Sequence, residues 1–404
     1  MRISILGQGY VGLNVAIAAA KAGHVVTGID VNSRLIDNLQ KGIHQVPGID
    51  RDSILELISN KKYFPTVDPS DISKSEIVII TVPTPLNIKR IPDLSLLEIA
   101  SKTISKYAND NLLIINESTS YPGTLRNFIA PLIQNNNLSN LLFASSPERV
   151  DPGNTIWNML NTPRVISGLS PKATLKAKDF YSSFCKIIHE VSSPEVAEAS
   201  KLLENTFRQV NIALVNEFSE IASKLNFSAN EAIKAASTKP FGFMPFFPSI
   251  GVGGHCIPID PSYLSYAANL VGVDANFIDL ANKTNLLASK NIARRIANYM
   301  GGTLKGIKIQ IAGIAYKTNI SDMREAPSLL LMRELRELGA NVLWNDDLVG
   351  EFESEKSSPL LANIDLGLIV TPHDIIDFGV WVRSGTRVLD LSANSKNLGW
   401  AKFF

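Results

Sequence analysis

At 404 residues the chain is too long for one ordinary hydrophobic core, so we expect two or three domains. Its 39 basic and 38 acidic residues leave a formal charge of +1, which gives no electrostatic reason to expect nucleic acid or an anionic membrane as a partner. The two cysteines form no disulfide framework, no apolar run approaches the ~18 residues of a membrane span, and no signal peptide is visible, so we expect a soluble cytoplasmic protein.

The N-terminal part alternates short apolar runs with helical segments. Its apolar runs predict strands at 3–6, 25–30, 77–82, 112–116 and 141–144, and the spacing at 11–21 predicts a helix. Runs of this kind, bounded by turn residues, are typical of buried parallel strands. With helices between them they indicate βαβ units and a doubly wound sheet.

A much longer helix is expected from 194 to 226. Pro194 suits its first turn. The apolar residues that recur close to helical spacing are Leu202, Leu203, Val210, Leu214, Phe218, Ile221 and Leu225. About thirty helical residues span ~45 Å, a length typical of helices that bridge domains or build a dimer interface.

The C-terminal part returns to an α/β pattern, with strands expected at 307–316 and 341–344, a helix at 328–338 and a polar surface loop at 350–358. A weak internal repeat is present, because the helix end, glycine, strand and aspartate of 22–30 recur at 338–346. We infer a second Rossmann-like unit. Its first turn, 313–319, lacks the glycine triplet and should bind something other than a dinucleotide.

The first turn carries a dinucleotide-binding fingerprint, Gly7-Gln8-Gly9-Tyr10-Val11-Gly12, between the first strand and the first helix. Its glycines allow a tight turn, close approach of a pyrophosphate and close helix–strand packing. Asp30 ends the second strand, where a carboxylate accepts hydrogen bonds from a ribose and repels a 2′-phosphate. Arg34 could hold such a phosphate, but Asp30 occupies the recognition position, so NAD is favoured over NADP. Another kind of phosphate-binding turn is the alternative.

A glycine-rich loop at 251–260 contains Cys256, one of the two cysteines. A hydride acceptor together with a nucleophilic thiol is suited to oxidising an aldehyde through a thioester. Alternatively, Cys256 is a small buried hydrophobic residue, as we expect for Cys185 in its strand-like run. His255 could act as a base, although an immediate neighbour can equally point elsewhere.

The long helix carries Lys201, Asn205 and Arg208 at positions i, i+4 and i+7, hence on one face. This stripe is either a solvated surface or a cation and an amide donor directed at a developing oxyanion.

These features together resemble the UDP-glucose/GDP-mannose dehydrogenase family of nucleotide-sugar dehydrogenases over essentially the whole chain. The segments that carry the resemblance are 7–12, 82–85, 117–124, 146–149, 198–205, 251–260, and 316–317 through 322–325. It implies an α/β fold with two Rossmann-like doubly wound domains joined by a long central helix and a helical dimerisation region. The implied parts are an NAD-binding domain at 1–193, a dimerisation region with the catalytic cysteine loop at 194–300, and a UDP-sugar-binding domain at 301–404.

The resemblance implies oxidation of the C6 alcohol of a nucleotide sugar to a carboxylate with two NAD and one water. By position, Cys256 would attack the C6 aldehyde, and Lys201 and Asn205 would stabilise the oxyanions. Glu148 would be the general base. The residues implied to order the water and tune the site are Asp260 and Thr119.

The resemblance also implies the binding residues, and no metal. The NAD site would contain Gly7, Gly9, Tyr10, Val11, Gly12, Asp30, Arg34, Val82, Pro83, Thr84, Thr119 and Arg324. The sugar nucleotide would be bound by Glu148, Arg149, Lys201, Asn205, Arg208, Phe247, Gly253 and Lys317.

Within the family, the segments 146–154 and 238–248 are similar to the branch that acts on UDP-N-acetylhexosamines, especially UDP-N-acetylglucosamine. UDP-glucose and UDP-N-acetylmannosamine are the alternative substrates. A homodimer or larger homo-oligomer and a role in surface polysaccharide biosynthesis are further implications.

Two other functions stay open at this point. In a single-step dehydrogenase of the hydroxyacid or sugar-phosphate type, Lys201 would be the acid/base and Cys256 would be structural. In a binding protein without turnover, NAD and the nucleotide sugar would be bound but not converted.

Overall fold

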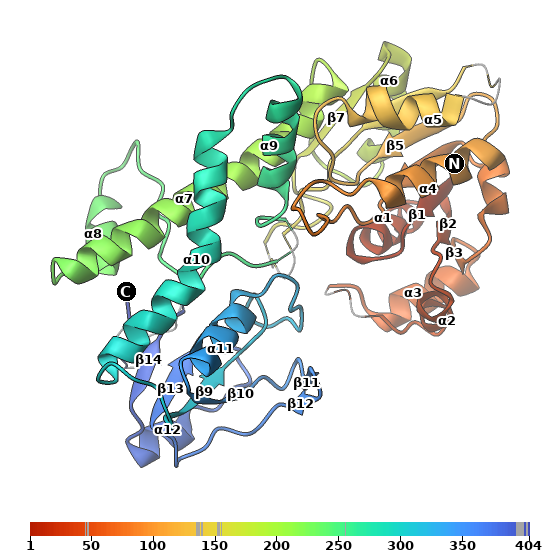
Figure 1. Cartoon of the computed structure of the whole chain (residues 1–404). Helices are drawn as coiled ribbons and strands as arrows, with labels where there is room; N and C mark the ends of the chain where they lie inside the picture. Colours follow the sequence, from red (N-terminus) through yellow and green to blue (C-terminus); the bar gives the residue numbers. More distant parts are fainter. Residues whose placement is uncertain are drawn as a thin grey trace. The chain divides into compact units, whose positions relative to one another are not determined.

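The computed structural model describes residues 1–44, 46, 48–134, 138, 140–151, 154, 156–254, 256–392, 400 and 403–404. By its contacts the chain divides into two compact units. The first unit is Met1–Glu204 with Ser262–Val273, and the second is Asn205–Pro261 with Asp274–Phe404. Each unit contains a sheet with helices packed on it, so the predicted α/β class is confirmed (Figure 1). The division into three domains at 193 and 300 stays a prediction.

An eight-stranded sheet forms the centre of the first unit. Its strands are β1 (Arg2–Leu6), β2 (Val25–Ile29), β3 (Tyr63–Thr66), β4 (Ile77–Ile80), β5 (Leu113–Asn116), β6 (Leu142–Ser145), β7 (Arg164–Gly168) and β8 (Ile188–Glu190). They lie in the order β3-β2-β1-β4-β5-β6-β7-β8, and the strand order reverses beside β1 as in dinucleotide-binding folds. The sheet is parallel except where β6 and β7 pair antiparallel through Ala144 and Gly168.

Helices cover both faces of this sheet, because its central strands are apolar on both sides. All four residues of β4 are buried. One face packs against α1 (Tyr10–Lys21), α2 (Ser33–Gln40), α3 (Arg51–Ser59) and α6 (Pro171–Ser182). The other face packs against η1 (Pro69–Lys74), α4 (Ser95–Tyr107), η2 (Leu125–Ile129) and α5 (Ala130–Gln134).

The long helix predicted from apolar spacing is confirmed as α7 (Pro194–Lys224), with 31 residues. In the second unit its side chains bond to α10 (Asn276–Tyr299), for example through Gln209 and Asn282, and through Glu220, which accepts from Asn291 at 2.6 Å. Two shorter helices, α8 (Ala229–Ala236) and α9 (Asp260–Leu270), lie between α7 and α10 in the sequence.

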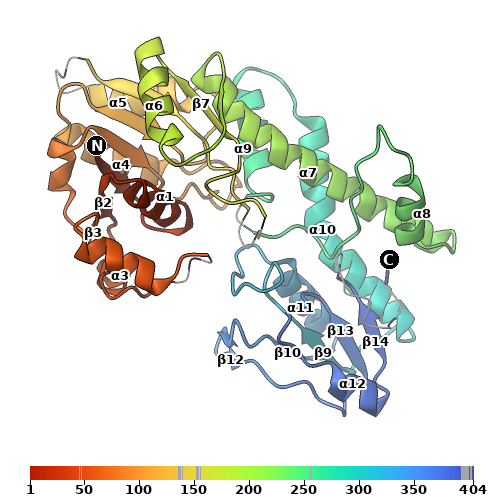
Figure 2. The same cartoon turned by 180° about the vertical axis from the view of Figure 1, so that it is seen from behind.

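The second unit contains a four-stranded parallel sheet in the order β10-β9-β13-β14 (Figure 2). Its elements are β9 (Lys308–Ala312), β10 (Asn341–Asn345), β13 (Leu366–Ile369) and β14 (Val388–Asp390), with α11 (Pro327–Glu337) and α12 (Gly379–Ser384). The strand predicted at 307–316 is too long, because Gly313 takes a φ of +80° and turns the chain. The polar loop predicted at 350–358 also contains a short antiparallel hairpin, in which β11 (Glu351–Phe352) and β12 (Glu355–Lys356) have two residues each.

The internal sequence repeat, 22–30 and 338–346, corresponds to repeated local geometry. Gly7 donates its N–H to the carbonyl oxygen of Ile29 at 2.8 Å, and Gly313 donates to that of Asn345 at the same distance. The order β10-β9-β13-β14 repeats the order β2-β1-β4-β5 of the first unit. The prediction of a second Rossmann-like unit is therefore confirmed.

The aspartate that ends β10 has a different role from Asp30. Asp346 is fully buried, and its Oδ2 accepts from the backbone N–H groups of Ile314 at 2.8 Å and Ala315 at 3.0 Å. The same oxygen contacts Nε2 of His373 at 2.9 Å. These bonds leave Asp346 unsuited to binding a ribose, in agreement with the expectation that this turn binds something other than a dinucleotide.

Candidate active site

The turn between β1 and α1 has the geometry that a dinucleotide-binding glycine motif requires. Gly7 has a φ of +93°, and a Cβ built there would lie 2.7 Å from the carbonyl oxygen of Thr81. A Cβ on Gly12 would lie 1.8 Å from the carbonyl oxygen of Gly7, so helix and strand pack too closely for a side chain. Among the described residues, no atom lies within 4 Å of a Cβ built on Gly9. This leaves open space for a pyrophosphate at the N-terminal end of α1.

Asp30 follows β2 and accepts two hydrogen bonds from neighbouring backbone. Its Oδ2 accepts from the N–H of Gln8 at 2.8 Å, and its Oδ1 accepts from that of Asn32 at 2.9 Å. Since a carboxylate has about four acceptor positions, both oxygens can still accept from ribose hydroxyls. Arg34 is exposed on α2. The residues present therefore fit NAD.

Two further loops lie at the same sheet edge as the glycine turn. Val82, Pro83 and Thr84 follow β4, and Thr119, which is 8% exposed, follows β5. The buried Thr84 is held by its carbonyl oxygen, which accepts from the hydroxyl of Tyr263 on α9 at 3.1 Å. Because β1, β2, β4 and β5 are parallel neighbours, their carboxyl ends bring the predicted cofactor-binding positions of the first unit together.

Glu148 follows β6, is 7% exposed and has a fixed carboxylate. Its Oε1 accepts from the backbone N–H groups of Arg149 at 2.7 Å and Val150 at 2.6 Å. Its Oε2 accepts from Nη2 of Arg164 at 3.1 Å. The guanidinium of Arg149, a predicted substrate-binding group, forms an ion pair with Glu204 at 2.6 Å.

Lys201 on α7 is 8% exposed, so the solvated-surface interpretation does not hold at this position. One turn earlier, Glu198 accepts from the N–H groups of Gly123 at 2.7 Å and Leu125 at 2.9 Å, and from Oγ of Ser120 at 3.3 Å. Burial raises the pKa of Glu198 to about 7, although these donors act in the opposite direction. Glu198 thus fastens the segment after β5 to the helix that carries Lys201, a role that sequence reasoning did not identify.

The two cysteines have opposite environments. Cys185 is 5% exposed, its thiol donates to the carbonyl oxygen of Met159 at 3.3 Å, and burial raises its pKa to about 11. Cys256 is exposed, and its carbonyl oxygen accepts from the N–H of Asp260 at the start of α9. His255 and residues 152–153 lie outside the described residues.

The loop that precedes Cys256 belongs to the second unit and packs closely on Tyr316 of the same unit. A Cβ on Gly254, where φ is +86°, would lie 2.8 Å from the ring of Tyr316, and one on Gly253 would lie 2.8 Å from Cβ of Tyr316. Gly254 donates its N–H to the carbonyl oxygen of Arg324 at 3.0 Å. The guanidinium of Arg324 pairs with Asp322, which raises the pKa of Arg324. Arg324 therefore lies beside the thiol loop.

Asn205 and Asp260 are brought together in the second unit. Nδ2 of Asn205 donates to Oδ2 of Asp260 at 2.6 Å, and Asp260 is 1% exposed. Arg208 is exposed on α7, and Phe247 is half-buried in the segment before the thiol loop.

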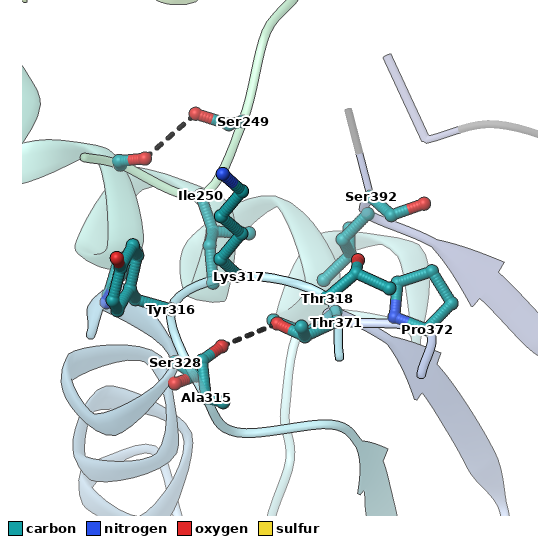
Figure 3. Close-up of a pocket in the computed structure, with 14 residues that line it drawn as sticks. Ser249, Ile250, Ala315, Tyr316, Lys317, Thr318, Ser328, Thr371, Pro372 and Ser392 are labelled. Carbon is teal, nitrogen blue, oxygen red and sulfur yellow. Dashed lines mark hydrogen bonds between the residues drawn. The ribbon is translucent and has the colours of Figure 1, made fainter. Parts of the chain in front are cut away.

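A cavity of about 170 Å³ lies at the carboxyl ends of β9, β13 and β14 (Figure 3). Figure 3 shows Lys317 and Ser392 among its lining residues, with the hydroxyl of Thr371 bonded to the carbonyl oxygen of Ala315 at 2.6 Å. The lining residues are Ser249–Gly251, Ala315–Thr318, Pro327, Ser328, Val370–Pro372, Leu391 and Ser392. Of the predicted substrate-binding residues that the structure describes, Lys317 lines this cavity. A cation surrounded by hydroxyl groups suits an anionic, hydroxyl-bearing ligand.

Comparison with known proteins decides the family. Three domain profiles of the UDP-glucose/GDP-mannose dehydrogenase family match the chain, the NAD binding domain at residues 1–185, the central domain at 195–286 and the UDP binding domain at 310–388. The chain belongs to this family. UDP-N-acetyl-D-mannosamine dehydrogenase of Pyrococcus horikoshii is 35% identical over 393 residues, which cover 92% of this chain and 90% of the relative.

UDP-N-acetyl-D-glucosamine 6-dehydrogenase of Pseudomonas aeruginosa is 33% identical over 358 residues, which cover 85% of this chain and 82% of the relative. The solved structure of the Pyrococcus horikoshii UDP-D-ManNAc dehydrogenase superposes with a TM-score of 0.88 at 32% identity, covering 100% of this chain and 98% of that structure.

Membership confirms the predictions of an NAD-dependent nucleotide-sugar 6-dehydrogenase, of NAD as cofactor and of a UDP-sugar as substrate. Among the described residues, no helix combines the length and hydropathy that a membrane span requires. No group of three or more His, Cys, Asp or Glu side chains in that part of the chain could hold a metal ion.

Proposed function

We propose that this dehydrogenase oxidises the C6 alcohol of a UDP-N-acetylhexosamine to a carboxylate, through a thioester on Cys256. The observation that carries the proposal is the contrast between the two thiols. Cys256 is exposed at the N-terminal end of α9, whose partial positive charge stabilises a nearby anion. Cys185 is buried, and its raised pKa keeps it protonated and unreactive at neutral pH.

NAD, when bound, would supply the acceptor for one hydride, so the two oxidations would use two NAD molecules in turn. Gly9 provides the space for its pyrophosphate, and Asp30 provides acceptors for its ribose. Val82, Pro83, Thr84 and Thr119 would complete this site. Arg324 is a further proposed cofactor-binding residue.

The thiol step forms a carbon–sulfur bond. The Cys256 thiolate adds to the carbonyl carbon of the C6 aldehyde, and the oxygen becomes an oxyanion until the second hydride leaves and a thioester remains. Asn205 already donates one of its two amide N–H groups to Asp260, which orients the amide and leaves the other N–H for this oxyanion. The buried ammonium of Lys201 is the second proposed donor.

Hydrolysis then releases the product. Glu148 would take a proton from water as the water oxygen attacks the thioester carbon, the carbon–sulfur bond would break, and the Cys256 thiolate would leave. Because three donors hold the carboxylate of Glu148, about one of its four acceptor positions is left for this water. Asp260 and Thr119 are the proposed ordering groups for it.

The sugar class is supported by the names of the relatives. The two enzymes compared above act on UDP-N-acetyl-D-glucosamine and UDP-N-acetyl-D-mannosamine, and both are similar to this chain over most of its length. UDP-N-acetylglucosamine is our first candidate. UDP-N-acetylmannosamine is the second, because the solved structure of the Pyrococcus horikoshii enzyme superposes over the whole chain. Lys317 would bind the anionic part of the substrate in the cavity of the second unit.

A substrate panel tests the sugar class. The purified enzyme with excess NAD is given UDP-N-acetylglucosamine, UDP-N-acetylmannosamine, UDP-N-acetylgalactosamine or UDP-glucose, and kcat/KM and the acidic product are measured. We expect at least one acetamido sugar to exceed UDP-glucose by about tenfold or more, since about 1.4 kcal/mol of differential transition-state binding suffices. A preference for UDP-glucose would overturn the sugar class, and binding of UDP-sugars without NADH formation would favour a non-catalytic protein.

A further inference from the structure

The guanidinium of Arg164 is buried and bonds to Glu148, the proposed base. Arg164 begins β7, and its side chain is 5% exposed. Its Nη2 donates to Oε2 of Glu117 at 2.6 Å and to Oε2 of Glu148 at 3.1 Å, and its Nε donates to Oγ of Ser146 at 3.3 Å. The ring of Tyr181 lies 4.2 Å from Cζ. A buried charge persists only with partners of this kind, so the arrangement fixes where the guanidinium lies.

The carboxylate of Glu148 is held from two sides. Backbone N–H groups of Arg149 and Val150 bond to Oε1, and Arg164 bonds to Oε2. The backbone donors fix one oxygen, whereas the direction of the second oxygen, and of its remaining lone pair, depends on Arg164. Without Arg164, Oε2 would lose its charged donor.

We propose that Arg164 is a positioning residue for Glu148, which orients the free lone pair of Oε2 toward the water that hydrolyses the Cys256 thioester. The inference rests on the proposed role of Glu148 as base. Arg164 touches neither substrate nor cofactor in this account, and it acts only through the carboxylate.

Glu117 holds Arg164 from the far side. Its Oε1 accepts from the hydroxyl of Tyr181 at 2.5 Å, and burial raises its pKa to about 7, against the effect of Arg164. The other titratable groups that face the guanidinium are Tyr181 and Cys185, whose pKa values burial also raises, so both stay uncharged near neutral pH.

The test compares Arg164→Lys, Arg164→Gln, Glu148→Gln and the double variant Arg164→Gln/Glu148→Gln. Stopped-flow absorbance gives the NADH burst and the steady-state rate, and intact-mass spectrometry of quenched enzyme gives the acylated fraction of Cys256. Arg126→Lys is the matched control, because Arg126 pairs with Glu195 at 2.7 Å in the same unit, is half-exposed and has no contact with Glu148.

We expect both Arg164 variants to show a burst of two NADH per active site and to accumulate acylated enzyme, because hydrolysis becomes the slow step. Their steady-state kcat should fall about 10- to 100-fold, the loss typical of a misplaced catalytic group, while KM for the sugar changes little. Arg164→Lys should retain more activity than Arg164→Gln, since lysine keeps the positive charge but lacks the rigid, planar set of N–H donors of the guanidinium. The double variant should be no slower than Glu148→Gln alone, because Arg164 acts through that residue.

The positioning role would be overturned if Arg164→Lys had the kcat of the wild type. It would also be overturned if the fold-losses in kcat of the two single variants multiplied in the double variant. If Arg164→Gln does not fold, Arg164→Lys decides alone. If Glu148→Gln itself turns over like the wild type, the assignment of the base fails and this inference fails with it. A wild-type enzyme that forms only one NADH per sugar consumed would instead overturn the proposed function.

Discussion

Among single residues, the proposed chemistry depends on which of the two thiols reacts. Cys256→Ala should abolish uronate formation while leaving the fold intact, because the side chain of Cys256 is exposed. Cys185→Ala is the matched control. It should keep most of the activity and lose about 1 kcal/mol of stability, the usual cost of removing a small buried side chain.

The measurements are product formation by chromatography and unfolding in urea. Undiminished uronate from Cys256→Ala would exclude the covalent route, and an inactive but folded Cys185→Ala would mean that the wrong cysteine has been assigned. Cys256→Ser, with a poorer nucleophile, should stall as a slowly hydrolysed ester.

Glu198 predicts a pH dependence of stability. Its folded-state pKa is raised from 4.5 to about 7 by burial, so its contribution is fully present below pH 4.5 and is lost as the pH rises through about 7. A shift of this size corresponds to a contribution on the order of 3 kcal/mol.

We therefore expect the free energy of unfolding of the wild type to fall relative to that of Glu198→Gln as the pH rises from 4.5 to 8, because the amide does not titrate. Urea unfolding across this range measures it. A difference that is independent of pH would show that Glu198 titrates normally.

A local sequence pattern was enough to locate the glycine turn and Asp30, whereas residues that are placed by tertiary contacts gave no signal in the sequence. Gly7, Gly9 and Asp30 stand in a strand–turn–helix context that has few other uses, and the structure gives them the expected geometry. Arg164 and Tyr263 carry no such signal. Arg164 meets Glu117, 47 residues away, and Tyr263 meets Thr84, 179 residues away, only after the chain folds.

At the scale of elements, the thiol loop depends on glycine for two separable reasons. Gly254 has a positive φ and also lies against the ring of Tyr316. Gly272, at the end of α9, has a φ of +75°, but among the described residues no atom lies within 4 Å of a Cβ built on it. Alanine at Gly272 should therefore cost only the backbone strain, about 1 kcal/mol.

Gly254→Ala should cost the same strain and in addition displace the loop that carries Cys256. A displacement of about 1 Å is expected to lower kcat/KM by about 100-fold. Kinetics and thermal unfolding of both variants check this prediction. Equal activity of Gly254→Ala and Gly272→Ala would show that the contact with Tyr316 has no catalytic role.

Element prediction was accurate where periodicity is strong. The apolar spacing of α7 and the buried run of β4 are long or uniform enough to identify. By contrast, β8 has three residues, of which two are exposed, and β3 contains Pro65, so neither presents a pattern distinct from a loop. The end of β9 was predicted four residues late, because the turn at Gly313 lies within a continuous apolar run.

At the level of the whole molecule, several apolar side chains of α7 and α10 are exposed. Phe207, Leu214 and Ile221, spaced by seven residues, are 45%, 61% and 48% exposed, and on α10 Phe277 and Leu280 are 81% and 60% exposed. Exposed apolar surface of this extent is typical of an interface. We propose that a second copy of the chain covers it, as a homodimer.

Light scattering should give the mass of a dimer at micromolar concentration, and Leu214→Glu should shift the protein toward monomer, since a buried charge opposes association. Leu175→Glu on α6, where Leu175 is 59% exposed, is the control and should leave the mass unchanged. A monomer mass that does not depend on concentration in the wild type would contradict the proposed assembly.

If one enzyme performs both oxidations and the hydrolysis, two NADH form for each sugar, so counting electrons tests the proposed function most directly. Purified enzyme is incubated with UDP-N-acetylglucosamine, or with the preferred sugar of the panel, and excess NAD, and NADH is compared with sugar consumed. The account predicts a ratio of two with a uronate as product. A ratio of one with an aldehyde or ketone as product would contradict it, because the reaction would then end at a single oxidation and Cys256 would have no thioester to form.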